Sequence, residues 1–224
     1  MGTRPKLWIG NRNYSSWSLR PWLVLRWGGI DFEEEVIPLG EDGYGAGKIA
    51  AVRAVSPTGR VPVLHLGGDV VVWDSLAISE WAAERAPGLW PEDEAARAVA
   101  RSVTAEMHSG YGALRRDLSM NIRRRVAEPA WPEDTREDIA RVTGLWEELR
   151  GRYGAGGPWL FGARSVADAF FAPVVTRFRT YGVPMEGVVA AYAEVVLGDP
   201  DFRAWEGEAE REVWVIGGTD GLWG

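Results

Sequence analysis

Apolar and polar residues follow two different periods along the chain, and the change of period divides it in two. In about the first 85 residues, short β-rich runs are separated by stretches with helical spacing. The run Gly67-Gly68-Asp69 between two β-rich segments is typical of a hairpin. The order predicts a small α/β domain with a mixed sheet. We expect strands at 6–9, 32–38, 61–66 and 70–73, and helices near 18–27, 48–55 and from 75 onward.

The rest of the chain has helical spacing throughout. Pro87, Gly88 and Pro91 interrupt the pattern, so we place a linker at residues 86–91. The sequence therefore predicts an α/β domain at 1–85 followed by an all-helical domain at 92–224. The expected helices of the second domain span 92–118, 132–153, 165–181, 184–197 and 199–212.

Composition narrows the classes of function. The net charge of −7 argues against a nucleic-acid or anionic-membrane partner, and Arg123-Arg124-Arg125 is interpreted as a solvated helix face. No signal pattern or long apolar stretch is present, which favours a cytoplasmic protein. The two histidines, His65 and His108, lie far apart, and we expect no metal site. Because the chain has no cysteine, any thiol chemistry must use a thiol brought by a ligand.

Two hydroxyls stand where the first strand meets the first helix. Pro21 lacks an N–H and suits a first helical turn, so we expect this helix to begin near Trp17 or Ser18. Ser15 and Ser16 then precede free amides and the positive end of the helix dipole. They could simply cap the helix, or they could hold an anion such as a ligand thiolate, whose pKa a donated hydrogen bond lowers.

Two further segments carry candidate chemistry. Pro62 opens a strand that should be central, so Val61-Pro62 is either an ordinary trans bond or a cis bond that frees the Val61 main chain to pair with a peptide-like ligand. Asp74-Ser75 caps the following helix and could also hold the carboxylate and amine of an amino-acid head group. Ser165 and Asp168 fit a capping box, which we assign to folding.

Together these segments resemble the cytosolic glutathione transferases, and the serine-using, zeta-like group in particular. Ser15-Ser16-Trp17-Ser18-Leu19-Arg20 is similar to the zeta-type Ser-Ser-Cys-x-x-Arg signature. Residues 56–64 resemble the Asn-Pro-x-x-x-Val-Pro-x-Leu segment of the family, and residues 73–78 its Glu/Gln-Ser-x-Ala-Ile segment. The resemblance extends from about residue 6 to residue 212.

This resemblance implies a thioredoxin-like domain that binds glutathione, a helical domain that supplies an acceptor pocket, and a homodimer with Asp74 near its axis. It assigns Ser15 to the glutathione sulfur, with Ser16 as a neighbour or substitute. The implied glutathione-binding residues are Lys48, Arg60, Val61, Pro62, Asp74 and Ser75.

In such an architecture the acceptor should lie between the Ser15 loop and the first long helix of the second domain. Met107, Tyr111 and Arg115 share one face by their spacing. A buried arginine needs an anion, so we hypothesise that Arg115 meets a carboxylate of the acceptor. The candidate pocket residues are Met107, His108, Tyr111, Arg115 and Met120.

Three functions remain open from the sequence. The first is transfer of glutathione to a small electrophile. The second is glutathione-dependent isomerisation of the maleylacetoacetate type, although Trp17 replaces the cysteine of that signature. The third is a non-catalytic binding module with the same fold. The thiol could also be a different small thiol, and the tail 213–224 either folds back over the pocket or packs as an extension.

Overall fold

The computed structural model describes residues 4–40 and 47–223, and its first part is built on a four-stranded mixed sheet. The strand order is β2-β1-β3-β4, in which β1 runs parallel to β2 and antiparallel to β3, and β4 is antiparallel to β3. This is the thioredoxin-like arrangement that the resemblance implied. The strands are β1 (Lys6–Ile9), β2 (Glu33–Val36), β3 (Val63–Gly67) and β4 (Val70–Trp73).

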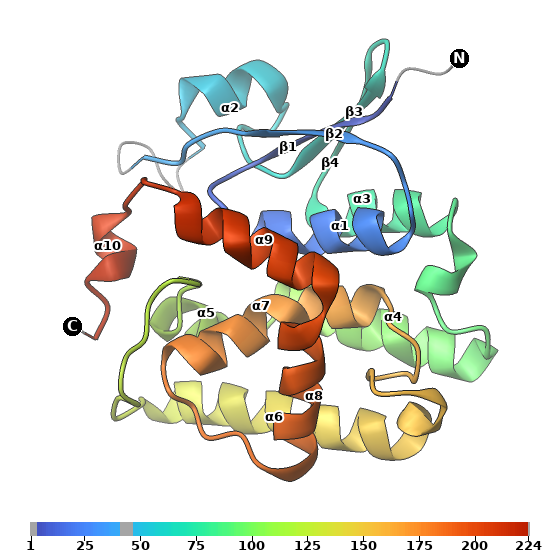
Figure 1. The fold of residues 1–224 in the computed structure, drawn as a ribbon, viewed down its shortest axis with the longest axis vertical. Helices are drawn as coiled ribbons and strands as arrows, with labels where there is room; N and C mark the ends of the chain where they lie inside the picture. Colours follow the sequence, from blue (N-terminus) through green and yellow to red (C-terminus); the bar gives the residue numbers. More distant parts are fainter. Residues whose placement is uncertain (1–3, 41–46, 224) are drawn as a thin grey trace.

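Helices cover both faces of this sheet (Figure 1). Helix α2 (Ala50–Val55) lies on one face, whereas α1 (Ser16–Trp27) and α3 (Ser75–Ala83) lie together on the other. Helix α1 begins earlier than the sequence predicted, at Ser16, so Pro21 falls in its second turn. The N-cap explains the shift, because Ser15 caps the helix through its own side chain and places the start there.

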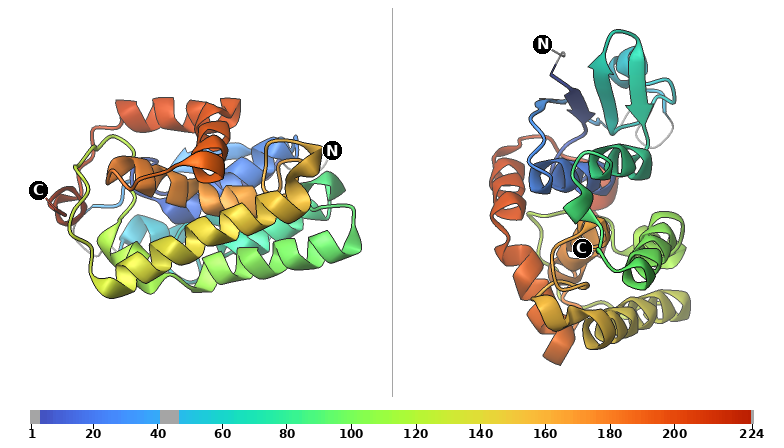
Figure 2. Two further views of the ribbon diagram at one scale, coloured as in Figure 1. Left: turned by 90° about the horizontal axis from the view of Figure 1, so that it is seen from below. Right: turned by 90° about the vertical axis from the view of Figure 1, so that its right-hand side faces the viewer.

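The remainder of the chain is helical, as predicted (Figure 2). A 3₁₀ turn (Pro87–Leu89) follows α3, and a second (Gly154–Gly156) follows α6. Among the described residues no helix is both long and apolar enough to cross a membrane. The helices are α4 (Glu94–Ser109), α5 (Gly112–Asp117), α6 (Glu133–Tyr153), α7 (Val166–Thr180), α8 (Gly187–Gly198), α9 (Pro200–Arg211) and α10 (Gly217–Asp220).

The long helix expected at 92–118 is in fact two helices. Gly110 ends α4 in an extended conformation, and Tyr111 adopts the left-handed conformation with φ 60° before α5 begins. A residue in that conformation cannot continue a right-handed helix. The predicted common face of Met107, Tyr111 and Arg115 is therefore wrong, because the chain changes direction between the first residue and the other two.

The two halves share one hydrophobic core. Helix α1 packs against α3 on its sheet side and against α7 on its helical side, so α7 is the main contact between the halves. Within the helical half, Trp146 is fully buried among Phe171, Phe178 and Tyr192. The capping box predicted for α7 is confirmed, since Ser165 and Asp168 exchange hydrogen bonds at its first turn.

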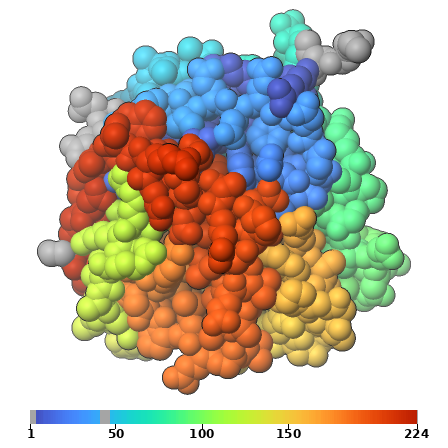
Figure 3. Space-filling view, viewed as in Figure 1, coloured from blue at the N-terminus to red at the C-terminus, as the bar shows by residue number. Residues whose placement is uncertain are grey.

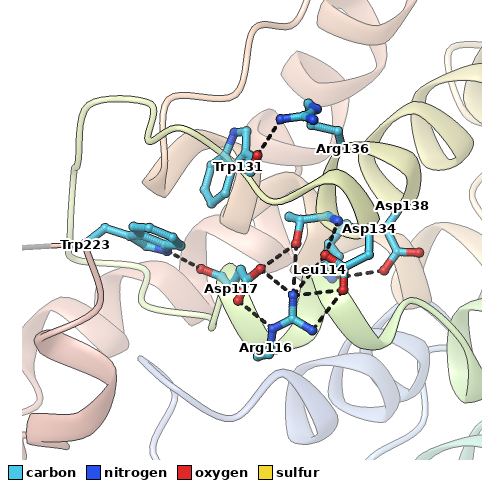
Figure 4. Close-up of polar contacts among 9 residues, drawn as sticks. Leu114, Arg116, Asp117, Trp131, Asp134, Arg136, Asp138 and Trp223 are labelled. Atoms are coloured by element: carbon cyan, nitrogen blue, oxygen red, sulfur yellow. Dashed lines mark hydrogen bonds and ion pairs between the residues drawn. The ribbon is translucent and has the colours of Figure 1, made fainter.

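The tail folds back along the molecule (Figure 3). Ile216 is buried against residues of the sheet half, and Trp223 donates a 2.8 Å hydrogen bond to the carbonyl of Asp117 (Figure 4). Arg123 and Arg124 hold the tail by donating to the carbonyls of Trp214 and Thr219. The interpretation of these arginines as a solvated helix face is wrong, because the segment is not helical and its charges are used internally.

Candidate active site

A cavity of about 620 Å³ opens between the sheet half and the helical half. Its walls come from the start of α1, the loop before β3, the start of α3, the segment around α5, helix α7 and the tail. The described lining residues are Tyr14, Ser15, Ser16, Trp17, Leu39, Gly47, Ile49, Val52, Thr58, Gly59, Arg60, Val61, Pro62, Trp73, Asp74, Ser75, Arg115, Ser119, Met120, Arg177 and Thr219.

Both predicted serines line this cavity at the N-terminus of α1. Ser15 is the N-cap residue, and its hydroxyl donates to Ser18 Oγ at 2.8 Å and accepts from the Ser18 N–H at 3.4 Å. Ser18 Oγ also accepts a 3.1 Å hydrogen bond from the N–H of Gly10, which ties α1 to the end of β1. The positive end of a helix dipole, with hydroxyls beside it, is suited to an anion.

Ser16 is the first helical residue and has a different partner. Its hydroxyl oxygen accepts a 3.0 Å hydrogen bond from Nη2 of Arg177, a buried residue of α7. The other terminal nitrogen of Arg177 donates to the carbonyl of Leu118 at 2.6 Å. A guanidinium from the helical half therefore lies directly beside the serine pair of the sheet half.

The Val61–Pro62 bond is cis, so of the two alternatives left open by the sequence the structure has the cis form. The hydrogen-bonded ladder between β3 and its neighbouring strands begins at Val63. Val61 precedes this ladder and belongs to the cavity wall. Val61 is thus a lining residue outside the ladder, so an extended ligand in the cavity could pair with its main chain.

Asp74 and Ser75 occupy a tight corner between β4 and α3. Asp74 has φ 76° and caps α3 by accepting from the N–H of Leu76 at 2.8 Å. A positive φ is rare for residues other than glycine, and strained backbone of this kind is concentrated at functional sites. The buried hydroxyl of Ser75 has no hydrogen-bond partner among the described residues. An unsatisfied buried hydroxyl in a cavity wall is a ready contact for a polar ligand.

Three arginines place positive charge at this cavity: Arg115 and Arg177 line it, and Arg20 is buried nearby. Arg20 is fully buried between the rings of Trp17 and Phe170, and none of its three guanidinium nitrogens has a hydrogen-bond partner within the described part of the chain. Burial, followed by the charges of Arg115 and Arg177, lowers the pKa of Arg20 well below its ordinary value. Such an environment favours an anion nearby.

Arg115 lines the cavity, and its guanidinium carbon lies 5.1 Å from the ring centre of Trp17. Its Nε donates to the carbonyl of Gly110 at 2.9 Å, and Nη2 donates to the carbonyl of Met107. Burial lowers the pKa of Arg115 as well. These carbonyls fix the guanidinium at the end of α4, where it faces the cavity beside Trp17.

His108 lies behind Trp17, outside the cavity wall. Its Nε2 is 3.4 Å from Oδ2 of Asp74, and its ring packs edge-on against Trp17 with the ring centres 5.3 Å apart. Burial lowers the pKa of His108, and the nearby carboxylate of Asp74 opposes this shift only in part. The contact between His108 and Asp74 joins the two halves.

The remaining predicted residues are divided between the cavity and its surroundings. Arg60 and Met120 line the cavity. Lys48 is exposed and outside the described lining, although Gly47 and Ile49 on either side of it belong to that lining. Met107 and Tyr111 are buried in the core, and the Tyr111 hydroxyl donates to Glu106 at 2.7 Å.

Arg177, Tyr14 and Thr219 are among the lining residues that the sequence did not reveal. Arg177 belongs to the helix whose capping box we assigned to folding, and an arginine in a largely apolar helix is a signal for a buried partner. The Tyr14 hydroxyl donates to Asp220 at 2.9 Å, which brings the tail and Thr219 to the cavity. In the described residues, no group of three or more acidic or histidine side chains is placed to hold a metal ion.

Residues 14–85 match the family model described as the glutathione S-transferase N-terminal domain. The chain is 29% identical over 211 residues to maleylacetoacetate isomerase from Pseudomonas aeruginosa, covering 88% of this chain and 93% of that relative. Among solved structures it is similar to maleylacetoacetate isomerase from Anaeromyxobacter dehalogenans with bound glutathione, with a TM-score of 0.66 and 26% identity over 95% of this chain and 99% of that one.

A glutathione transferase homologue from Burkholderia, also with bound glutathione, has the same fold, with a TM-score of 0.70 and 23% identity over 94% of this chain and 100% of that one. The fold thus defines a two-domain class in which a thioredoxin-like sheet domain and a helical domain meet at a serine-lined cavity. Within that class, residues 14–85 match the N-terminal domain of the glutathione S-transferases, and the chain as a whole is similar to zeta-like members of that family.

Proposed function

We propose that the protein is a glutathione transferase that holds glutathione as a thiolate and directs it at a small electrophile. The observation that carries the proposal is that one cavity is lined by the serine pair at the start of α1 and by Ser75, whose hydroxyl has no hydrogen-bond partner among the described residues. Bound there, glutathione supplies the sulfur nucleophile, because the chain has no thiol of its own.

The chain's residues divide the work of binding. The main chain of Val61, beside the cis Pro62, pairs with the peptide part of the ligand, while Ser75 and Asp74 hold the amino-acid head group. A serine hydroxyl at the start of α1 donates to the sulfur, which favours the thiolate over the thiol. Arg60, which lines the cavity, and the exposed Lys48 bind the far carboxylate. Proximity of the two substrates supplies the rest of the rate enhancement.

The acceptor is proposed to be acidic. Arg115 and Arg177 line the cavity, with Arg115 beside Trp17, and the buried Arg20 adds positive charge near them. A neutral acceptor would leave that charge uncompensated, whereas a carboxylate would be attracted to it. A relative from Anaeromyxobacter dehalogenans was crystallised with dicarboxyethyl glutathione and citrate in its active site, which supports acidic ligands for this site.

The same charge favours a second candidate, glutathione-dependent isomerisation of an unsaturated diketo acid. Two similar relatives named above are maleylacetoacetate isomerases. Against it, Trp17 occupies the position of the cysteine in the zeta-type signature. The Trp17 side chain is 37% exposed. We therefore place transfer first.

Product analysis separates the two. The protein is incubated with glutathione and, in turn, an acidic electrophile and an unsaturated diketo acid, and the products are resolved by mass spectrometry. A glutathione conjugate formed faster than in the protein-free control supports transfer. An isomer with glutathione recovered in full supports isomerisation, and neither product above the control contradicts both.

We further propose a homodimer. Strand β4 is an edge of the sheet, and Val70 and Trp73 on it are 56% and 48% exposed. Large apolar side chains on an exposed edge are typical of an interface. Sedimentation equilibrium should give twice the mass of the chain, and Trp73→Glu should shift the protein toward the monomer.

A further inference from the structure

The two serines at the start of α1 differ in the hydrogen bonds that their hydroxyl groups make. A serine has one proton to donate. The Ser15 hydroxyl donates it to Ser18 Oγ at 2.8 Å, and its oxygen accepts from the Ser18 N–H. Ser18 Oγ in turn accepts from Gly10. Ser15 is therefore engaged in holding the helix start to the end of β1.

Ser16 is placed to donate. Its oxygen accepts from Nη2 of Arg177 at 3.0 Å, and within residues 4–40 and 47–223 no hydrogen bond uses the Ser16 hydroxyl proton. A hydrogen bond from a charged donor is stronger than one from a neutral donor, and it polarises the O–H group that receives it. The Ser16 proton is thus both uncommitted and made a better donor.

Arg177 is itself firmly placed. It is only 5% exposed, and Nη1 donates to the carbonyl of Leu118 at 2.6 Å. Its helix, α7, is the element of the helical half that packs most closely on α1. The guanidinium therefore reaches the serine pair across the contact between the two halves.

We propose that Ser16 is the hydroxyl that donates to the sulfur of bound glutathione, and that Arg177 is its positioning residue. Arg177 fixes and polarises the Ser16 hydroxyl and adds positive charge beside the sulfur. Both effects favour the thiolate. The inference rests on the proposed function and assigns to the second serine the role that the family resemblance gave to the first.

The test is the pKa of the thiol of bound glutathione, followed by the ultraviolet absorbance of the thiolate across a pH titration. Loss of a hydrogen bond to a charged group should raise that pKa by about one to two units in Ser16→Ala. The rate below that pKa should fall about ten- to a hundredfold, with KM for glutathione changed much less. Ser15→Ala should raise the pKa by less and should lower the melting temperature more. The reverse ranking would overturn the inference.

Arg177 is tested with a matched pair on one helix. Arg177→Met should raise the bound-thiol pKa, and Arg177→Lys, which keeps the charge but loses the fork, should give an intermediate value. Arg179→Met is the control, because Arg179 pairs with Glu206 and is outside the cavity lining. It should leave the bound-thiol pKa unchanged. If Arg177→Met does not fold, a bound-thiol pKa in Arg177→Lys equal to that of the wild type overturns the inference.

Titration of the wild-type protein distinguishes a failure of this inference from a failure of the proposed function. If bound glutathione titrates with the pKa of free glutathione in the wild type, both the proposed function and the inference fail. If the wild-type pKa is lowered but Ser16→Ala leaves it lowered, the inference alone fails.

Discussion

At the scale of single residues, the site is marked by positive charge held in largely apolar surroundings. Arg20 is fully buried without a hydrogen-bond partner among described residues, and burial, followed by the charges of Arg115 and Arg177, lowers its pKa. The sequence showed Arg115 as a charge in an apolar stripe, and it lines the cavity. It showed Arg20 only as part of a motif, because no pattern reports that a side chain lacks partners.

Arg115→Ala should weaken acidic acceptors selectively. Loss of a charge-assisted hydrogen bond of about 1.5–3 kcal/mol should raise KM for an acidic acceptor roughly ten- to a hundredfold. KM for a neutral acceptor should change far less, and steady-state kinetics with both measures the difference.

The matched control is Arg116→Ala, because Arg116 pairs with Asp117 and Asp134 and is not part of the cavity lining (Figure 4). It should leave both KM values unchanged. Equal losses for acidic and neutral acceptors in Arg115→Ala would reject the anion subsite.

At the scale of elements, the sequence predicted the features that local side-chain chemistry decides. It failed where the backbone conformation of a single residue changes the direction of the chain. The capping box at Ser165 and the hairpin at 67–69 follow from side-chain and glycine preferences that act locally. The break between α4 and α5 depends on Tyr111 adopting a left-handed conformation, which tyrosine rarely does. Tertiary packing imposes that conformation, so propensity could not reveal it.

Asp168 in the α7 capping box should make stability depend on pH. Burial raises its pKa to about 6, despite hydrogen bonds from Leu160 and Ser165. Since the folded pKa exceeds the unfolded value, the folded state binds more protons between about pH 4 and pH 6. The contribution of Asp168 is therefore greatest below pH 4 and falls as the pH rises through 6, by about 2–3 kcal/mol.

Denaturant unfolding of the wild type and Asp168→Asn across this pH range measures the effect, because the asparagine does not titrate. Relative to the variant, the wild type should lose free energy of unfolding as the pH rises from 4 to 6. A difference that stays constant with pH would show that Asp168 is ionised in the folded protein throughout.

At the scale of the whole molecule, the tail joins the two halves beside the cavity. Asp220 accepts hydrogen bonds from Tyr14 of the sheet half and from Asn121 of the helical half. Ile216 fills a buried position, and Trp223 reaches Asp117. The sequence left open whether the tail covers the pocket or packs as an extension. It does both, since Thr219 belongs to the cavity wall. No local pattern encodes contacts between residues so distant in the chain.

Removing residues 213–224 should lower the free energy of unfolding by about 3 kcal/mol. That figure combines the burial of Ile216 with the loss of about one to two net hydrogen bonds. Denaturant unfolding of the full and shortened chains gives the value, and Val213→Ala, which alters a residue 83% exposed, is the control. A shortened chain as stable as the full one would show that these contacts contribute nothing.

The account as a whole depends on glutathione binding in the cavity with its thiol ionised by the start of α1. Calorimetric titration of the protein with glutathione near pH 7, repeated in two buffers of different ionisation enthalpy, measures affinity and proton release together. The account predicts saturable binding with a fraction of a proton released for each glutathione bound. Absence of binding heat, or binding without proton release, would contradict it.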